Sequence, residues 1–192
     1  MILSNYFKDE IKLNEVQIAE MLDVSPTPVR EAFRMLSSDG LVEIIPWKGV
    51  FIKKYTIEDL TELYQCREAL EVLAVQLSIQ KIDIKEIQSL KTKITSHSES
   101  VDERVKLSNT IHEIILKWAN NKRLTEMLSQ LNSQLVYDRR MTAYDEERQK
   151  EIDSEHMEIL NALMEKNEEK AVTSMQNHIR NGLNYIKNNY TH

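Results

Sequence analysis

The spacing of hydrophobic and polar positions changes once along the chain, near residue 55. Before that point, apolar residues recur three and four positions apart in two stretches, one over residues 14–22 and one from Pro26 to Gly40. Two runs rich in β-branched residues follow at 41–45 and 50–54, with a Pro/Gly turn between them. The first spacing is typical of amphipathic helices, and paired β-branched runs around such a turn predict a hairpin. Helix, turn, helix and two-stranded hairpin is the order of a winged helix-turn-helix.

Local capping signals mark where these helices begin and end. Asn14, with Gln17 three residues later, resembles a capping box, and Ser25 is a favourable N-cap ahead of Pro26. Gly40 stands where a left-handed residue is needed to end the second helix. We therefore expect a winged helix-turn-helix domain over residues 1–55.

The remainder of the chain has a helical pattern throughout. Gly182 is the only proline or glycine after Gly49, and such a long stretch without turn-forming residues excludes a sheet-rich domain. Thr56 with Asp59 forms a second capping signature, at the start of a long amphipathic helix. Further helices are expected at 84–97, 101–119, 122–145, 150–166 and 168–189. We expect an all-helical domain over residues 56–192 and a fold class that is mainly α.

Composition and charge narrow the class of protein. Hydrophobic residues make up 41% of the chain and charged residues 29%, which is ordinary for a soluble globular protein. No apolar run approaches the ~20 residues that span a bilayer, and the start lacks a signal-peptide pattern, so we expect a cytoplasmic protein without a membrane partner. The formal net charge of −6 argues against indiscriminate nucleic-acid binding, so any DNA contact must be local.

Two smaller features have simple interpretations. Cys66 is the only cysteine and lies in a helical pattern, so we interpret it as a small packing residue. The charged string Asp145–Arg148 is interpreted as a solvated helix face with local ion pairs.

The segment from Leu13 to Ala32 carries a long and specific motif. It closely resembles the head of GntR-family regulators, whose usual pattern is L-x-E-x-x-L-A-x-x-L-x-V-S-R-T-P-V-R-E-A, and the resemblance continues through Gly49–Ile52. Pro26 departs from the pattern, because the family usually has arginine there. The family's head also begins with a longer helix than Met1–Lys8 provides, so we expect that first helix to be truncated.

The resemblance and the chemistry of this segment indicate the same DNA contacts. A recognition helix offers backbone N–H groups and small hydroxyls to phosphates, and arginines one turn apart can reach a phosphate or the edge of a guanine. Taken singly, Ser25 would be expected only to cap a helix and the arginines only to face solvent. Within this framework we expect contacts from Ser25, Thr27, Pro28, Arg30, Arg34, Lys48 and Gly49, the last two at the tip of the wing.

From Glu62 to about Tyr190 the chain resembles the FCD domain of FadR-type GntR regulators, an antiparallel bundle of six or seven helices. The resemblance rests on R-x-x-x-E-x-x-A from Arg67, E-H-x-x-I-L-x-A-L from Glu155, and the closing A-x-x-x-M-x-x-H that ends at His178. Many members bind a divalent metal through one aspartate and three histidines. Here the three histidine positions hold His112, His156 and His178, whereas the aspartate position holds Ser108, followed by Asn109.

The positions of these histidines along their helices bear on the same site. Each lies at the apolar face of its predicted helix or at the edge of that face, so all three could point into the bundle. A single histidine on such a face is more often a core residue that makes its hydrogen bonds. Three on separate helices favour convergence on zinc or nickel, which imidazole suits. Ser108 removes the anionic ligand and leaves its position to water or to an effector carboxylate.

The resemblance implies a DNA-binding transcriptional regulator, expected to be a repressor and a homodimer on a two-fold operator. The expected effector is a small carboxylate beside Arg67, whose guanidinium can bond two oxygens, with Ser108 and Asn109 as neighbours. We do not expect an enzyme. Two alternatives remain open from the residues: a metal-dependent hydrolase using the three histidines, and a purely structural dimerisation bundle.

Overall fold

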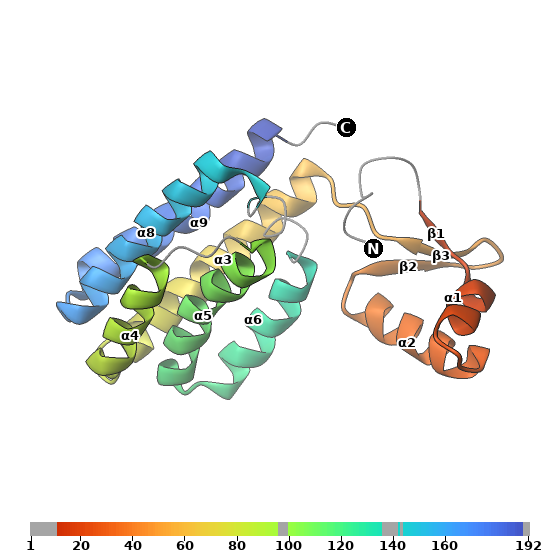
Figure 1. The fold of residues 1–192 in the computed structure, drawn as a ribbon, viewed down its shortest axis with the longest axis horizontal. Helices are drawn as coiled ribbons and strands as arrows, with labels where there is room; N and C mark the ends of the chain where they lie inside the picture. The colour runs from red at the N-terminus through yellow and green to blue at the C-terminus, as the bar shows by residue number, and fades with distance from the viewer. Residues whose placement is uncertain (1–10, 96–99, 136–141, 143, 190–192) are drawn as a thin grey trace.

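The computed structural model describes residues 11–95, 100–135, 142 and 144–189. Figure 1 shows a small N-terminal head beside a larger helical bundle, and the chain passes from one to the other between strand β3 and helix α3. The expected truncation of the first helix concerns residues before Ile11 and lies outside the described part of the chain.

The head contains the helix-turn-helix and the hairpin that the sequence predicts. Helix α1 spans Glu15–Met21 and α2 spans Pro26–Ser38, and strands β2 and β3 span Val42–Ile45 and Gly49–Ile52. A third strand, β1 at Lys12–Leu13, pairs antiparallel with β3, so the sheet order is β1-β3-β2 rather than a two-stranded wing alone. Two residues are too few to show the period-two pattern by which a strand is recognised.

A small apolar core holds the head together. Ala19 of α1 and Val29 and Phe33 of α2 are buried against one another, and Leu13 of β1 and Val50 of β3 pack on them. The third strand therefore contributes to this core as well as to the sheet.

The caps of the head lie where the sequence predicts them, but α1 shows only the Asn14 half of the expected capping box, and Ser25 also differs. The Asn14 side chain accepts hydrogen bonds from the backbone N–H groups of Val16 and Gln17, at 3.0 and 3.2 Å. Gly40 has a φ of +78°, the left-handed conformation expected after α2. Ser25 does occupy the N-cap position, with extended backbone, but its side chain makes no capping hydrogen bond, so the expectation of a side-chain cap was wrong.

Six helices of the described residues form the bundle. They are α3 (Ile57–Ser78), α4 (Ile84–Thr95), α5 (Val101–Ala119), α6 (Lys122–Gln134), α8 (Glu146–Met164) and α9 (Glu168–Asn189). Helix α3 packs against α5, α6 and α9, and α8 packs against α4 and α9. The long core between them is made of aliphatic side chains such as Ile79, Ile111, Ile115, Leu160 and Met175, all with no exposed surface. None of the described helices is long and apolar enough to cross a membrane.

Three expectations for this part need correction. Helix α6 ends at Gln134, where the N–H of Leu135 bonds to the Asn132 carbonyl, and does not continue to 145. Helix α8 begins at Glu146 because the Asp145 side chain caps it. Glu146 and Glu147 are exposed, as expected for a solvated face, and Glu147 pairs with Lys150, but Arg148 is only 4% exposed. Cys66 is exposed on α3 rather than packed.

Head and bundle are joined by contacts as well as by the chain. The hydroxyl of Tyr55, a residue of the connecting segment that packs into the bundle core, donates a hydrogen bond of 2.7 Å to the carbonyl of Gly40. The turn after α2 is thereby held against the segment that leads into α3.

Candidate functional site

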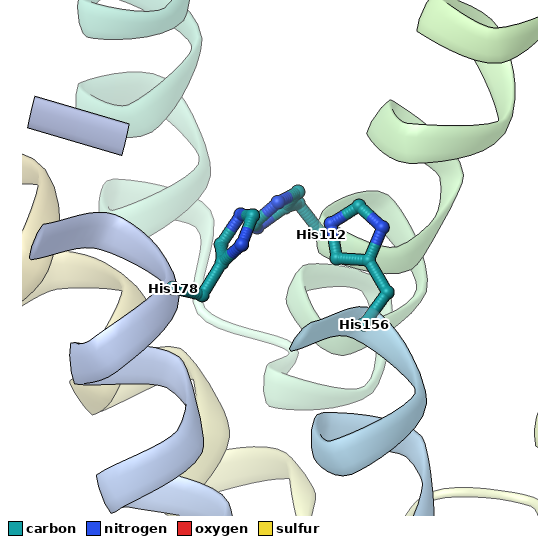
Figure 2. Close-up of side chains that lie close together, drawn as sticks. All are labelled: His112, His156 and His178. Atoms are coloured by element: carbon teal, nitrogen blue, oxygen red, sulfur yellow. The ribbon is translucent and has the colours of Figure 1, made fainter. Parts of the chain in front are cut away.

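Three buried histidines from three helices meet inside the bundle. His112 comes from α5, His156 from α8 and His178 from α9, and Figure 2 shows their rings facing one another. Their ring centroids are 4.7 to 5.9 Å apart, and one ligand atom from each ring lies within 4.8 Å of the others. The structure therefore brings together the three histidines that the sequence singled out, at a spacing that a single cation could span.

Burial keeps the rings of His156 and His178 neutral. Desolvation lowers the pKa of His178 to about 4, although the hydrogen bond from its ring to Glu155 acts in the opposite direction. Desolvation is also the largest cause that holds the pKa of His156 well below its usual value, followed by the charges of the other two histidines. Neutral imidazoles offer a nitrogen lone pair, which is the form that binds a metal.

One nitrogen of His156 indicates that the three histidines are suited to bind a metal ion. Its Nε2 is fully buried, and among the residues that the structure describes it has no hydrogen-bond partner. A buried polar atom without a partner costs about 1–3 kcal/mol, so such an atom calls for an explanation. A divalent ion of the zinc or nickel type would satisfy this nitrogen together with those of His112 and His178.

Two carboxylates lie behind the histidines. Oε2 of Glu155 is 2.8 Å from Nδ1 of His178, and Oε1 of Glu71 is 3.1 Å from Nδ1 of His112, in a less well aligned contact. Burial raises the pKa of the Glu155 carboxyl, but its bonds with His178, Arg148 and Asn181 outweigh this and hold the pKa below the ordinary value. Each of the two carboxylates therefore contacts the Nδ1 atom of one ring.

The sequence did not indicate these supporting residues. Glu71 and Glu155 were noted only as matches to a motif, and Arg148 was assigned to a solvated face. The spacing does hold a signal, because Arg148 and Glu155 are seven residues apart and so lie on one helix face two turns apart. Nothing in the sequence shows that this face meets α9.

The residues expected to hold an effector are only partly brought together. Arg67 is 5% exposed, its Nη2 lies 3.4 Å from Nε2 of His112, and its Nε lies 3.5 Å from Oε1 of Glu71. Asn109 lines a cavity of about 400 Å³ together with His112 and Glu71. Ser108 is half-buried on α5, one turn before His112, but neither it nor Arg67 lines that cavity.

The expected DNA contacts lie on one exposed element and at one exposed turn. Five of them are exposed along α2 and its N-cap, namely Ser25, Thr27, Pro28, Arg30 and Arg34. The two arginines form ion pairs with Glu15 and Glu31, both 2.8 Å long. Lys48 lies in the turn between β2 and β3, and Gly49 is the first residue of β3. Trp47, also in this turn, was not selected from the sequence although its side chain is fully exposed.

Both parts of the chain match known domain families. Residues 1–52 match the bacterial regulatory proteins of the gntR family, and residues 62–181 match the FCD domain. The chain is 29% identical over 193 residues to the uncharacterized HTH-type transcriptional regulator YdhC of Bacillus subtilis, which covers 97% of this chain and 86% of the relative. It is 26% identical over 190 residues to the Nta operon transcriptional regulator of Aminobacter aminovorans, which covers 97% of this chain and 89% of that one.

Solved structures agree on the fold. The chain resembles Escherichia coli McbR/YncC with a TM-score of 0.80 at 22% identity, over 99% of this chain and 93% of that one.

Proposed function

The chain belongs to the GntR family of bacterial transcriptional regulators and carries an FCD domain, and from this premise we propose a specific mode of control. Proteins of this family are regulators that bind DNA, not enzymes. We propose that this one is a cytoplasmic homodimer that represses transcription from a two-fold operator. A small carboxylate, held in the bundle at a divalent metal, would control its binding to DNA.

The observation that carries the proposal is the cluster of three buried imidazoles, one of which, His156, has a nitrogen without a hydrogen-bond partner among the described residues. His112, His156 and His178 would hold zinc or nickel, which supplies a positive centre for an anionic ligand. Because Ser108 stands where an aspartate ligand is usual, the coordination position of that aspartate would be free for water or for the effector carboxylate. Arg67 and Asn109 lie around the same histidine and would bind the remaining oxygens of the effector.

We divide the chain functionally at residue 55, into a DNA-binding head of residues 1–55 and an effector-binding and dimerisation domain of residues 56–192. The exposed first turn of α2 supports the placement of this helix in the major groove. Its arginines must exchange Glu15 and Glu31 for phosphates or bases on binding, since both guanidiniums are ion-paired in this structure. Lys48 and Gly49 would bind beside the groove through the wing.

Selection of duplexes from a random library with the full chain tests the proposal. We expect an enriched two-fold motif, whose affinity falls about 5- to 150-fold in Arg30→Ala and Arg34→Ala, because each loses a charge-assisted contact worth about 1–3 kcal/mol. Arg123→Ala is the control, since Arg123 is equally exposed and ion-paired but lies on α6. Failure to enrich any motif, or equal losses in all three variants, would contradict the assignment of α2.

The two alternatives fare differently. A hydrolase finds no support, because the family consists of regulators and because Glu155, the carboxylate nearest to His178, is already bound to that ring and to Arg148. A purely structural bundle stays a testable alternative. Such a bundle would hold no stoichiometric metal and would gain no thermal stability from zinc, nickel or dicarboxylates.

A further inference from the structure

The carboxylate of Glu155 contacts one histidine of the cluster, His178, and also the buried guanidinium of Arg148. Its Oε2 is 2.8 Å from Nδ1 of His178. An ionised carboxylate can only accept hydrogen bonds, so Nδ1 of this ring must carry the proton. The other ring nitrogen, Nε2, then keeps its lone pair. The contact therefore selects one of the two tautomers of His178.

The carboxylate itself is held rigidly. Arg148 donates to both of its oxygens, at 2.8 and 3.2 Å, and Asn181 of α9 donates to Oε1 at 2.9 Å. Arg148 is only 4% exposed, and its guanidinium lies 5.8 Å from the centre of the Tyr185 ring. Burying an arginine and a glutamate is costly unless their geometry is good. Both oxygens of the Glu155 carboxylate are hydrogen-bonded here, although Nε of Arg148 has no partner among the described residues, so the arrangement favours a defined role for this carboxylate.

We infer that Glu155, supported by Arg148, is a positioning residue that fixes the tautomer and orientation of His178 for binding of a metal. Metal-bound histidines generally donate their second ring N–H to a carboxylate or a carbonyl, which orients the ring and raises the basicity of the nitrogen that binds. This inference rests on the proposed function of the three-histidine site and adds Glu155 and Arg148 to it. The two adjacent residues Glu155 and His156 would then have different roles: His156 would bind the metal itself, and Glu155 would orient His178.

The test compares Glu155→Gln with Glu158→Gln in the full chain. Both changes remove one negative charge near His156 without altering side-chain size, but Glu158 is exposed and lies on another face of α8 than the buried His156. The first measurement uses metal-free protein with ¹⁵N-labelled histidine, in which long-range NMR correlations report the tautomer of each ring. We expect a pure Nδ1–H form of His178 in the wild type and in Glu158→Gln. In Glu155→Gln we expect a mixture, because an amide can either accept from Nδ1 or donate to it.

The second measurement is zinc affinity, by competition with a chromophoric chelator. We expect Glu155→Gln to lose about 10- to 100-fold, and Glu158→Gln to stay within about twofold of the wild type. Unchanged tautomer and unchanged affinity in Glu155→Gln would overturn the inference. If the wild type itself bound no zinc, the proposed metal site would fail, yet the tautomer measurement would still decide whether Glu155 positions His178.

Discussion

Nδ1 of His178 lies 2.8 Å from Oε2 of Glu155, although the two residues are 23 positions apart in the sequence and belong to different helices. The contact crosses from α8 to α9 and uses the ring nitrogen that faces away from a metal in the proposed site. The neighbouring residue, His156, enters the cluster from the same helix with no partner for its Nε2 among the described residues. This arrangement is suited to holding an ion and leads to predictions about stability as well as binding.

Restoration of the missing aspartate should strengthen the metal site. In Ser108→Asp we expect zinc affinity to rise at least tenfold, which corresponds to about 1.4 kcal/mol for an added anionic ligand. Thr110→Asp, on the same helix but on a different face, controls for the added charge. The measurement is competition with a chelator for both variants. Equal affinities in Ser108→Asp, Thr110→Asp and the wild type would show that position 108 does not face the ion.

The unpaired nitrogen of His156 predicts an unusual stability result. In metal-free protein, His156→Leu should leave the free energy of unfolding unchanged or raise it by up to about 2 kcal/mol, because it replaces an unsatisfied buried polar atom with apolar volume. His112→Leu is the contrasting variant, since it removes one partner of the buried carboxylate of Glu71, beside Arg67, and should destabilise the protein. Urea denaturation in the presence of a chelator measures both. A large destabilisation in His156→Leu would instead favour a structural bundle of hydrogen-bonded histidines.

The stability of the metal-free protein should fall as the pH is lowered. The folded protein holds the pKa of His178 at about 4, against 6.5 for an ordinary histidine, so between these values the unfolded chain binds a proton that the folded chain does not. Stability is therefore lost as the pH falls through this window, by about 2 kcal/mol between pH 7 and pH 5 from this one residue. Urea denaturation at both pH values measures the loss. His178→Gln should show a smaller difference between the two, and an equal difference would assign the loss to other groups.

The bond between Tyr55 and Gly40 predicts a link between head and bundle. Tyr55→Phe removes the hydroxyl that donates to the Gly40 carbonyl, so we expect a loss of about 1 kcal/mol in stability and faster hydrogen exchange around residues 39–41. Tyr185→Phe is the control, because its hydroxyl bonds to Asp145 at the start of α8, within the bundle. Hydrogen exchange measured by mass spectrometry separates the two variants. The same exchange pattern in both would show that Tyr55 does not restrain the head.

Local signals in the sequence were enough for the parts of the fold that depend on near neighbours. The Asn14 cap, the left-handed Gly40 and the Thr56–Asp59 capping box all form as predicted, because each involves residues within one turn of chain. The three histidines could be selected because a helix face is fixed by spacing. Whether they converge depends on how three helices pack, and there the family resemblance carried the prediction.

The features that were missed depend on contacts between distant segments. Arg148 looks like a surface residue in its own charged string, and only the packing of α8 on α9 buries it against Glu155 and Tyr185. Strand β1 exists because β3 has an edge to which two residues can pair. The early end of α6 has no counterpart in the hydrophobic pattern, which continues beyond Gln134 in the sequence.

The most direct test of the account is the metal content of the purified full-length chain, determined by mass spectrometry for the wild type, His112→Ala and His156→Ala. His97→Ala serves as the control, since His97 has polar neighbours in the sequence and occupies none of the three histidine positions of the FCD motif. We expect close to one zinc or nickel ion per chain in the wild type and in the control, and almost none in the two cluster variants. Metal-free wild-type protein that also takes up no added zinc or nickel would contradict the central claim that the three histidines form a metal site.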